Sequence, residues 1–422
     1  MRSPKLHAIV PPTLPLPVEE KLAQDTALLM HNQPGQSLLK VEVILEVSNV
    51  PFSSIYAYLA AKMLKEGTVT KSHQDITEIL ELCGAHLKVH LNADHFTLEL
   101  LVLASYAPPA IALLFEILQE VRFSKDRLDH VRALIAQKLT LKTAQNSYLS
   151  FQRFKRTIFG SSHPYGWSVL RQDLERVDAN ALQHHYNTAF LVPRYVLLSG
   201  CVTESCKQDI KRRFGALTLA QSPLPLQKPR VRTAQNIRQN APNALQASIL
   251  LGRVLPKASH RDYISLLIAN QAIGGYFGAR LVQIIREKLG YTYSISSHIT
   301  VLKQSSYWWL YTETSTQIAQ KAYREIQNQL ERLCTRPITK QELHTVKQHI
   351  LGEYIGRVHD PFWTMSKIKN VRLHHLPSDH YAQLADAVAC IEAADIRRIT
   401  QSYFSPTALT SVITSAEYPP AS

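Results

Sequence analysis

The sequence predicts an α+β protein made of two homologous halves. Residues 40–215 and residues 245–415 run through the same order of elements, which is a strand, two helices, two strands, two long helices, a final helix and a strand. Strands interleaved with helices and joined by short connections indicate, in each half, a sheet with helices packed on one face. The segment between the halves, residues 216–244, is rich in Pro, Gln and Arg and has no apolar periodicity, so we interpret it as a linker.

In the first half, residues 40–49 alternate as a strand does, and residues 53–67 place an apolar residue at every fourth position before a terminal glycine. Ser72 and Asp75 form a capping-box pattern that opens the next helix. That helix also ends at a glycine, and two alternating strands follow between residues 87 and 102.

The second half repeats this order. A strand, two helices and two strands are predicted, in sequence, at residues 244–253, 261–273, 278–290, 291–299 and 305–314. Two later pairs of segments are similar residue by residue: 123–135 resembles 337–350, and 177–190 resembles 391–404. A duplication explains these echoes better than chance does.

These patterns predict a division of the chain into five parts. They are an N-terminal extension, a first half, a linker, a second half and a tail, at residues 1–20, 21–215, 216–244, 245–415 and 416–422.

The composition excludes several classes of protein. With 45% hydrophobic and 19% charged residues the chain is typical of globular proteins. No apolar run reaches the ~20 residues that cross a bilayer, and prolines interrupt the N-terminal segment where a signal peptide needs a continuous apolar run. We therefore expect a cytoplasmic protein without a membrane partner. The five cysteines are odd in number and include no CxxC pair, which argues against a disulfide framework and a structural zinc site.

The net charge of +14 is compatible with an acidic partner. Lysine and arginine are spread along the chain and no nucleic-acid-binding motif accompanies them, so we expect no nucleic-acid partner. An acidic protein or peptide is the favoured interpretation of the charge.

One stretch of the second half, IGGYFGARLVQIIREKLGYTYSISS, resembles the C-terminal-half signature of the pitrilysin/insulinase family of zinc metallopeptidases, the inverzincins. The matching residues are Gly274, Gly275, Ala279, Arg280, Leu281, Ile285, Arg286, Glu287, Lys288, Gly290, Tyr293 and Ser294. The resemblance extends over roughly residues 20–415. It implies two homologous halves, each with two related α+β sandwich domains whose antiparallel-rich sheet carries helices on one face, together forming half of a clamshell chamber.

The resemblance also implies a zinc site, and this sequence lacks it. Active members carry H-x-x-E-H on the helix before a Gly-Thr turn, with a further Glu about 75 residues downstream. The two histidines and the distal Glu hold zinc, and the Glu of the motif activates the water bound to the zinc. Aligned on the Gly-Thr pair at 67–68, the corresponding positions hold Tyr58, Ala61, Lys62 and Gln137. We therefore expect no metal and no cofactor in this chain, and zinc only in a partner subunit.

Other residues do not rebuild a catalytic site. His86 and His90 share one face of a predicted strand and His95 follows, but no carboxylate base completes the set. The adjacent histidines at 184–185 and at 374–375 point in different directions on a helix.

Arg286 and Tyr293 match, in spacing, a family Arg/Tyr pair that binds the substrate backbone and helps to stabilise the tetrahedral intermediate opposite the zinc. A guanidinium and a phenol can both donate hydrogen bonds to a carbonyl oxygen as it gains charge. We expect Arg286 in the last turn of a helix, ended by Gly290, with Tyr293 on the strand that follows. The alternative is that Arg286 makes a surface ion pair and Tyr293 is an ordinary strand aromatic.

The resemblance thus implies a non-catalytic, substrate-binding subunit of a heteromeric zinc peptidase. Its partner would be a zinc-bearing homologous subunit, and the two would form a heterodimer. Arg286 and Tyr293 would hold a short or extended peptide substrate. The chain alone is not expected to be a peptidase. An alternative is a structural or binding protein of the same fold with no role in proteolysis. A third possibility, an autonomous peptidase, needs a nucleophile that we do not find, because Ser161, Ser162 and His163 lie outside any G-x-S-x-G elbow.

Overall fold

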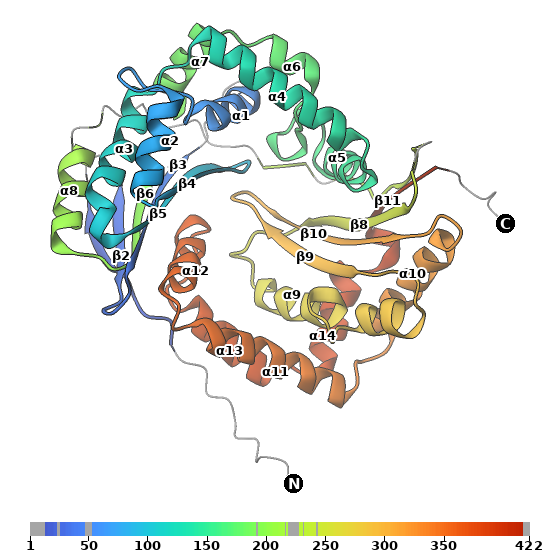
Figure 1. The fold of residues 1–422 in the computed structure, drawn as a ribbon. Coiled ribbons are helices and arrows are strands. Elements are labelled where there is room, and N and C mark those ends of the chain that lie inside the picture. The colour runs from blue at the N-terminus through green and yellow to red at the C-terminus, as the bar shows by residue number, and fades with distance from the viewer. Residues whose placement is uncertain are drawn as a thin grey trace.

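The computed structural model describes residues 13–22, 26–46, 53–190, 193–215, 217, 228–230, 232–241 and 244–416. Figure 1 shows the two halves side by side, and the described part of each half contains one sheet. The α+β class and the two-half organisation are confirmed. The expected number of sandwich domains is not confirmed. The resemblance implied two sandwich domains in each half, whereas the described part of each half forms one sandwich around one sheet.

The first sheet has the strand order β1-β2-β6-β3-β5-β4. Its strands are β1 (Val18–Lys21), β2 (Ala27–Asn32), β3 (Leu38–Glu46), β4 (His86–Leu91), β5 (His95–Leu103) and β6 (Pro193–Gly200). All neighbours are antiparallel except β2 and β6, which are parallel. The first strand begins inside the segment that the sequence predicted to be an extension.

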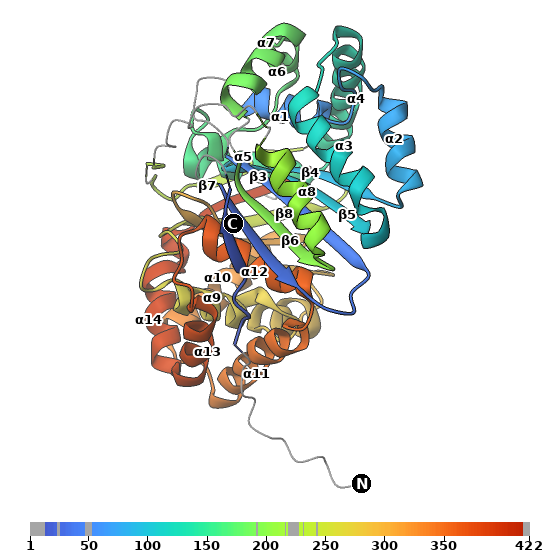
Figure 2. The ribbon, with the colours of Figure 1, turned by 90° about the vertical axis from the view of Figure 1, so that its left-hand side faces the viewer.

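The helices of the first half are α1 (Ser53–Met63), α2 (His73–Leu82), α3 (Ala107–Glu120), α4 (Lys125–Thr143), α5 (Asn146–Phe159), α6 (Arg171–Glu175), α7 (Ala179–His185) and α8 (Glu204–Gly215). Figure 2 shows α3 and α8 lying over one face of the sheet. The predicted capping box is confirmed at α2, where Ser72 Oγ accepts a hydrogen bond from Asp75 N–H and the Asp75 carboxylate accepts one from Ser72 N–H.

The second sheet has the order β7-β11-β8-β10-β9. Its strands are β7 (Asn236–Asn240), β8 (Ala247–Leu255), β9 (Ile295–Val301), β10 (Ser306–Thr314) and β11 (Thr410–Ser415). Here too one pair, β7 and β11, is parallel, so the second sheet repeats the first strand for strand apart from β1. Strand β7 lies within the segment predicted to be a linker.

The helices of the second half are α9 (Tyr263–Asn270), α10 (Ala319–Thr335), α11 (Lys340–Arg357), α12 (Pro361–Leu373), α13 (His380–Cys390) and α14 (Ala393–Tyr403), with π-helical turns at Gln271–Gly275 and Val282–Lys288. No helix among the described residues is long and apolar enough to span a bilayer.

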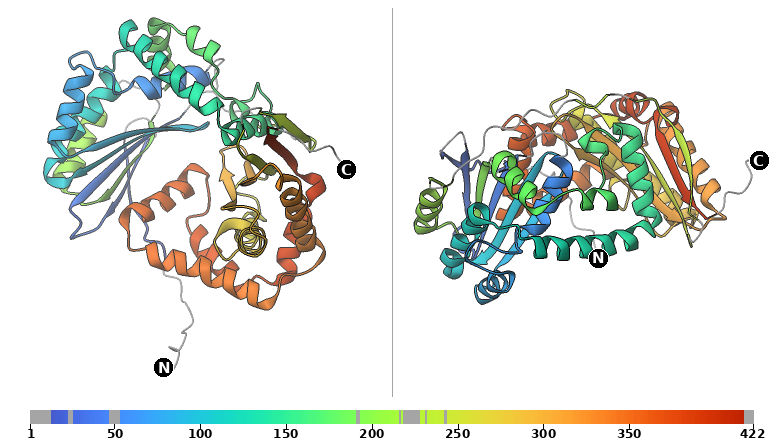
Figure 3. Two further views of the ribbon diagram at one scale, coloured as in Figure 1. Left: turned by 45° about the vertical axis from the view of Figure 1, so that its right-hand side comes forward. Right: turned by 90° about the horizontal axis from the view of Figure 1, so that it is seen from above.

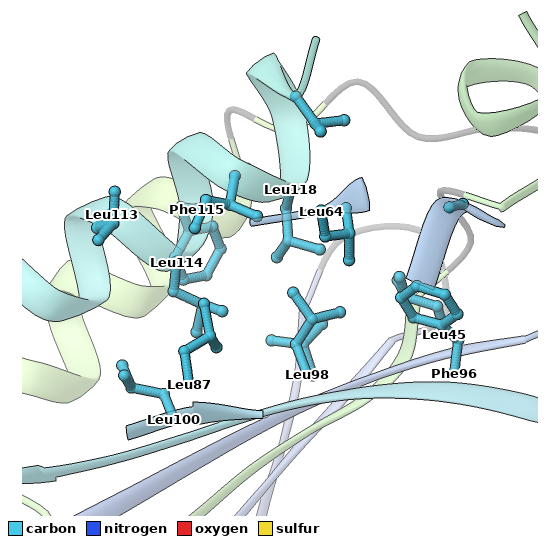
Figure 4. Packing of buried hydrophobic residues seen from close by; sticks show 14 of the residues in the cluster. Leu45, Leu64, Leu87, Phe96, Leu98, Leu100, Leu113, Leu114, Phe115 and Leu118 are labelled. Atoms are coloured by element: carbon cyan, nitrogen blue, oxygen red, sulfur yellow. The ribbon is translucent and has the colours of Figure 1, made fainter. Parts of the chain in front are cut away.

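Each sheet packs one face on helices of its own half. In the first half, alternate residues of β3, β4 and β5 meet α3, as Figure 4 shows for Leu87, Leu98 and Leu100 beneath Leu114 and Leu118. Because side chains alternate across a strand, the other face of the same sheet carries Glu42 and its neighbours in register.

The other face of each sheet is covered in part by a helix from the opposite half. Helix α5 of the first half packs on β8 and β11, with Phe154 and Ile158 buried against Leu250 and Val412. Helix α12 of the second half packs on β6 and β2, and lies next to the first sheet in Figures 1 and 3. The halves therefore exchange helices, and α5 and α12 occupy equivalent places in the duplication.

Polar contacts hold both exchanged helices in register. Ser150 Oγ of α5 lies 2.7 Å from Ser248 Oγ and 2.7 Å from Thr414 Oγ1, and all three residues are buried. On the opposite side, Lys369 of α12 pairs with Glu42 of β3, Nζ to Oε1 2.5 Å. Burial raises the pKa of Glu42, but Lys369 and Lys40 outweigh that effect, so its pKa lies below the ordinary value.

Candidate functional site

Helix α1 carries three of the positions at which the resemblance places a zinc motif. Its buried face consists of Ile55, Leu59 and Met63, at the predicted spacing of four, and packs into the core of the first half. Lys62 is exposed on another side of the helix, and Tyr58 is half-buried against the edge of that core. Figure 1 shows α1 beneath α4, the helix that carries Gln137, and the two helices are in contact.

The residues at these positions do not fit a zinc ion. Zinc sites in proteins use imidazole, thiolate and carboxylate ligands, and none of the four side chains supplies one. Burial raises the pKa of the Tyr58 phenol, with a further contribution from Tyr148, so deprotonation of this oxygen is disfavoured. Lys62 replaces a neutral imidazole of the motif with an ammonium group, and like charges repel, so this side chain disfavours a metal cation.

Aromatic rings and cations occupy this place instead. The Tyr58 ring meets Trp167 edge to face, with ring centroids 6.3 Å apart. Lys62 Nζ lies 5.7 Å from the centre of the Tyr58 ring. Burial lowers the pKa of Lys62, and the neighbouring charges of Lys138, Lys142 and Lys65 lower it further.

The histidines considered in the sequence do not converge on one point. His86 and His90 are exposed on the edge strand β4. His95 lies on β5, where its Nε2 is 2.9 Å from Asn92 Nδ2. Among the described residues, no group of three or more His, Cys, Asp and Glu side chains is arranged to hold a metal ion.

Arg286 and Tyr293 lie near each other in sequence at the end of the π-helical turn and in the loop after it. Gly290 adopts a positive φ of 63°, which glycine tolerates best, and so ends the turn as expected. The expected place of Tyr293 was wrong, because β9 begins only at Ile295 and Tyr293 stands in the preceding loop.

The surroundings of the two side chains differ. The Arg286 side chain is 40% exposed, its Nε lies 3.3 Å from Glu287 Oε1, and its guanidinium lies 5.1 Å from the centre of the Phe277 ring. Tyr293 is 90% exposed. No hydrogen bond or ring contact joins Arg286 to Tyr293 in the described structure.

The backbone that presents Tyr293 is fixed from both sides. Thr292 Oγ1 lies 2.5 Å from the Glu313 carbonyl oxygen, and it accepts a hydrogen bond from Ser294 N–H at 3.1 Å. Arg280 of the same signature anchors the helical turn by two hydrogen bonds to Glu342 of α11, at 2.8 and 2.7 Å. An exposed phenol on a tightly held loop is available to a ligand without further ordering of the backbone.

A cavity of about 490 Å³ lies between the halves. It is lined by Glu46, Asp94, His95, Arg194, Lys303 and His374, among others. Glu46 pairs with Arg194 at 2.6 Å and with Lys303, and Asp94 accepts hydrogen bonds from Tyr165 Oη at 2.7 Å and Lys303 N–H at 2.9 Å. The contacts of Lys303 with Glu46 and Asp94 join the two halves, whereas Arg194 and Tyr165 belong to the same half as the carboxylates they contact.

The sequence did not single out Lys138, Lys142, Tyr148 or Trp167. Lys138 follows Gln137 on α4, and Lys142 comes four residues after Lys138. This i, i+4 spacing is the signal that predicts a common helix face. Trp167 comes from a turn after α5, and no local pattern predicts its approach to Tyr58.

Comparison with known proteins gives two family matches. The profile described as "Insulinase (Peptidase family M16)" matches residues 56–161, and the one described as "Peptidase M16 inactive domain" matches residues 176–350. Among curated proteins, the "Uncharacterized zinc protease YmxG" of Bacillus subtilis is 22% identical over 80% of this chain and 82% of its own length. The "Non-peptidase homolog YmxG" of Helicobacter pylori is 24% identical over 70% of this chain and 69% of its own.

Solved structures show the same fold. The peptidase M16 inactive domain from Pseudomonas fluorescens superposes with a TM-score of 0.86 at 18% identity, covering 96% of this chain and all of the other. A structure described as a protease from Helicobacter pylori gives a TM-score of 0.85 at 16% identity, covering 95% of this chain and all of the other.

Proposed function

Because the chain belongs to the insulinase family, peptidase family M16, we propose that it is a non-catalytic, peptide-binding subunit that works beside a zinc-bearing homologous subunit. In this proposal the partner brings the zinc ion and the water that attacks the peptide. This chain brings Arg286 and Tyr293, which hold the substrate backbone. The Helicobacter pylori relative is named a non-peptidase homologue, and this name supports the proposal.

The exposure of Tyr293 carries the proposal. An aromatic side chain that is 90% exposed gains nothing from burial in this chain, yet its loop is held by hydrogen bonds on both sides. The phenol can donate a hydrogen bond to a peptide carbonyl, and the Arg286 guanidinium can donate a stronger, charge-assisted one. Such donors stabilise the oxygen that gains negative charge when a peptide bond is attacked.

A second candidate function is a structural or binding protein without a role in proteolysis. The contacts of Arg286 favour it, since Glu287 neutralises the guanidinium and Phe277 covers it from one side. Under this alternative, substitution of Arg286 and Tyr293 does not change the peptidase activity of a partner subunit.

The test is peptide hydrolysis by this chain alone, by a homologue that carries H-x-x-E-H, and by the two together. We expect activity that appears or rises strongly only in the mixture. The double variant Arg286→Ala, Tyr293→Phe should lower the activity of the mixture about 100-fold, because removing a single donor to a developing oxyanion already costs that much.

The matched control is Arg324→Ala, Tyr106→Phe, which removes the same groups from exposed positions elsewhere. It should leave the activity of the mixture unchanged. Equal activity of both double variants with wild type would support the structural alternative, and hydrolysis by this chain alone would contradict both.

A further inference from the structure

The surface around Lys62 gathers three cations and three aromatic rings from four parts of the first half. We call this set, Tyr58, Lys62, Lys138, Lys142, Tyr148 and Trp167, the cationic–aromatic cluster. Lys62 stands over Tyr58 at 5.7 Å, and Lys142 Nζ lies 5.8 Å from the centre of the Tyr148 ring. The Tyr148 phenol contributes to the raised pKa of Tyr58, and the Trp167 ring contacts the Tyr58 ring.

The positive charge of this cluster is not neutralised by the described residues. Lys62, Lys138 and Lys142 make no salt bridge with any carboxylate in the described part of the chain. Elsewhere lysines are paired, as Lys71 is with Glu116 at 2.6 Å and Lys207 with Glu20 at 2.7 Å. The charged groups that act on Lys62 are all lysines. Crowded like charges cost free energy, and a bound anion removes that cost.

The rings and the ammonium groups offer complementary contacts. A lysine ammonium is a compact point charge on a flexible stem, so it binds carboxylates without demanding one orientation. The ring faces beside it provide apolar area for the carbon atoms of an extended chain. Arg156 of α5, which donates a hydrogen bond to Ser168 Oγ at 3.2 Å, adds a further cation near Tyr148.

The position of the cluster connects it to peptide binding. Lys62 stands where active relatives place a zinc ligand, and its ammonium group supplies positive charge at the place where those relatives hold a metal cation. The Lys62 ammonium group can therefore attract substrate oxygen atoms as a metal cation does, but it cannot activate water for hydrolysis. This step rests on the proposed peptide-binding function.

We propose that the cationic–aromatic cluster binds acidic side chains of an extended peptide, so that this subunit selects peptides with runs of Glu or Asp. Single-stranded nucleic acid also suits cations interleaved with rings, but three lysines on two helices form a short patch rather than a groove that tracks a phosphate backbone. Nucleic acid is therefore an outcome of the test.

The test is fluorescence anisotropy with the full chain and a labelled, unstructured peptide containing a run of glutamates, compared with the same peptide carrying glutamines. We expect tighter binding of the Glu peptide and a loss of affinity as salt is raised. Lys62→Gln, Lys142→Gln should weaken binding about tenfold or more, which corresponds to about 1.4 kcal/mol.

The control is Lys321→Gln, Lys340→Gln, which lowers the net charge equally at exposed sites of α10 and α11. It should change the affinity less than about twofold. Equal losses in both variants, or equal binding of the Glu and Gln peptides, would overturn the proposal. A single-stranded oligonucleotide of similar length that binds more tightly than the Glu peptide would overturn it as well.

This assay needs no partner subunit, so its result is separable from the proposed function. The Arg286→Ala, Tyr293→Phe variant should still prefer the Glu peptide. Loss of that preference in this variant would place the acidic site at the Arg/Tyr pair and would contradict the cluster. Failure of the mixture to hydrolyse peptides, with the Glu preference intact, would refute only the divided enzyme.

Discussion

The ion pair between Lys369 of α12 and Glu42 of β3 joins the two halves, and its removal gives a measurable loss of stability. Glu42 is fully buried and lies 2.5 Å from Lys369 Nζ, with Lys40 as a second cation at 3.3 Å. Breaking a buried pair from one side costs about 3 to 5 kcal/mol, because one charge is left without its partner. Since Lys40 remains beside Glu42, we expect Lys369→Met to lower the free energy of unfolding by about 2 to 3 kcal/mol.

The assay is urea unfolding followed by circular dichroism and by tryptophan fluorescence. A double-mutant cycle separates the pair from its surroundings, using Glu42→Leu, Lys369→Met and both together. The double variant should recover most of the stability, because apolar residues of similar size replace a buried pair at little cost. Lys40 keeps Glu99 as a partner at 3.8 Å in the absence of Glu42.

The pH dependence gives an independent check. In the folded wild type the pKa of Glu42 lies below its ordinary value, so the pair contributes stability above about pH 4.5 and loses it as the pH falls through the folded pKa. Without Lys369, burial raises that pKa. The deficit of Lys369→Met should therefore be largest near neutral pH and shrink toward about pH 4. A deficit below about 0.5 kcal/mol, or a coupling energy near zero, would refute the reasoning.

Two further outcomes are expected. Gly252→Ala should lower the free energy of unfolding by about 3 kcal/mol in the same urea assay. The reason is that an added Cβ would lie 2.1 Å from the Trp308 carbonyl oxygen and 2.6 Å from Phe154 Cζ. In the control Gly352→Ala, on α11, the added Cβ meets nothing within 4 Å, so the free energy of unfolding should stay the same or rise slightly. Burial lowers the pKa of both His95 and His374 to about 4. Below about pH 6.5 the unfolded chain therefore takes up protons that the folded chain does not. The free energy of unfolding should fall from about pH 6.5 to about pH 4. His95→Asn, His374→Asn should flatten this slope, and a slope unchanged in calorimetry would contradict the assignment.

Local patterns were sufficient for the elements with strong periodicity. The alternation of β3, β4 and β5 and the capping box of α2 are encoded within a few residues, and the structure has them where the sequence predicts. Strand β7 escaped prediction because an edge strand needs no apolar alternation, and its residues are exposed or half-buried in turn. Its place in the sheet is set by pairing with β11, which lies far away in the chain.

The exchange of helices was also beyond sequence patterns. The apolar residues of α5 and α12 predict that each helix is buried, but not which sheet buries it. The same limit applies at the positions that align with the family's zinc motif. Spacing aligns Tyr58, Ala61, Lys62 and Gln137 with the family's three zinc ligands and its catalytic Glu. The approach of Trp167 and of the α4 lysines depends instead on how α1, α4 and the turn after α5 pack together.

The reciprocal exchange of α5 and α12 has a consequence for how the chain is made. All strands of the first sheet have been synthesised by residue 200, but α12, which covers Leu29, Ile44 and Leu197 on that sheet, ends only at residue 373. At about 5 to 20 residues per second, α12 is synthesised roughly 10 to 35 seconds after the last strand of the sheet that it covers. During that interval the nascent first half exposes an apolar surface beside a carboxylate that has not yet met Lys369. Any chaperone that attends this chain during synthesis has that face as its natural target.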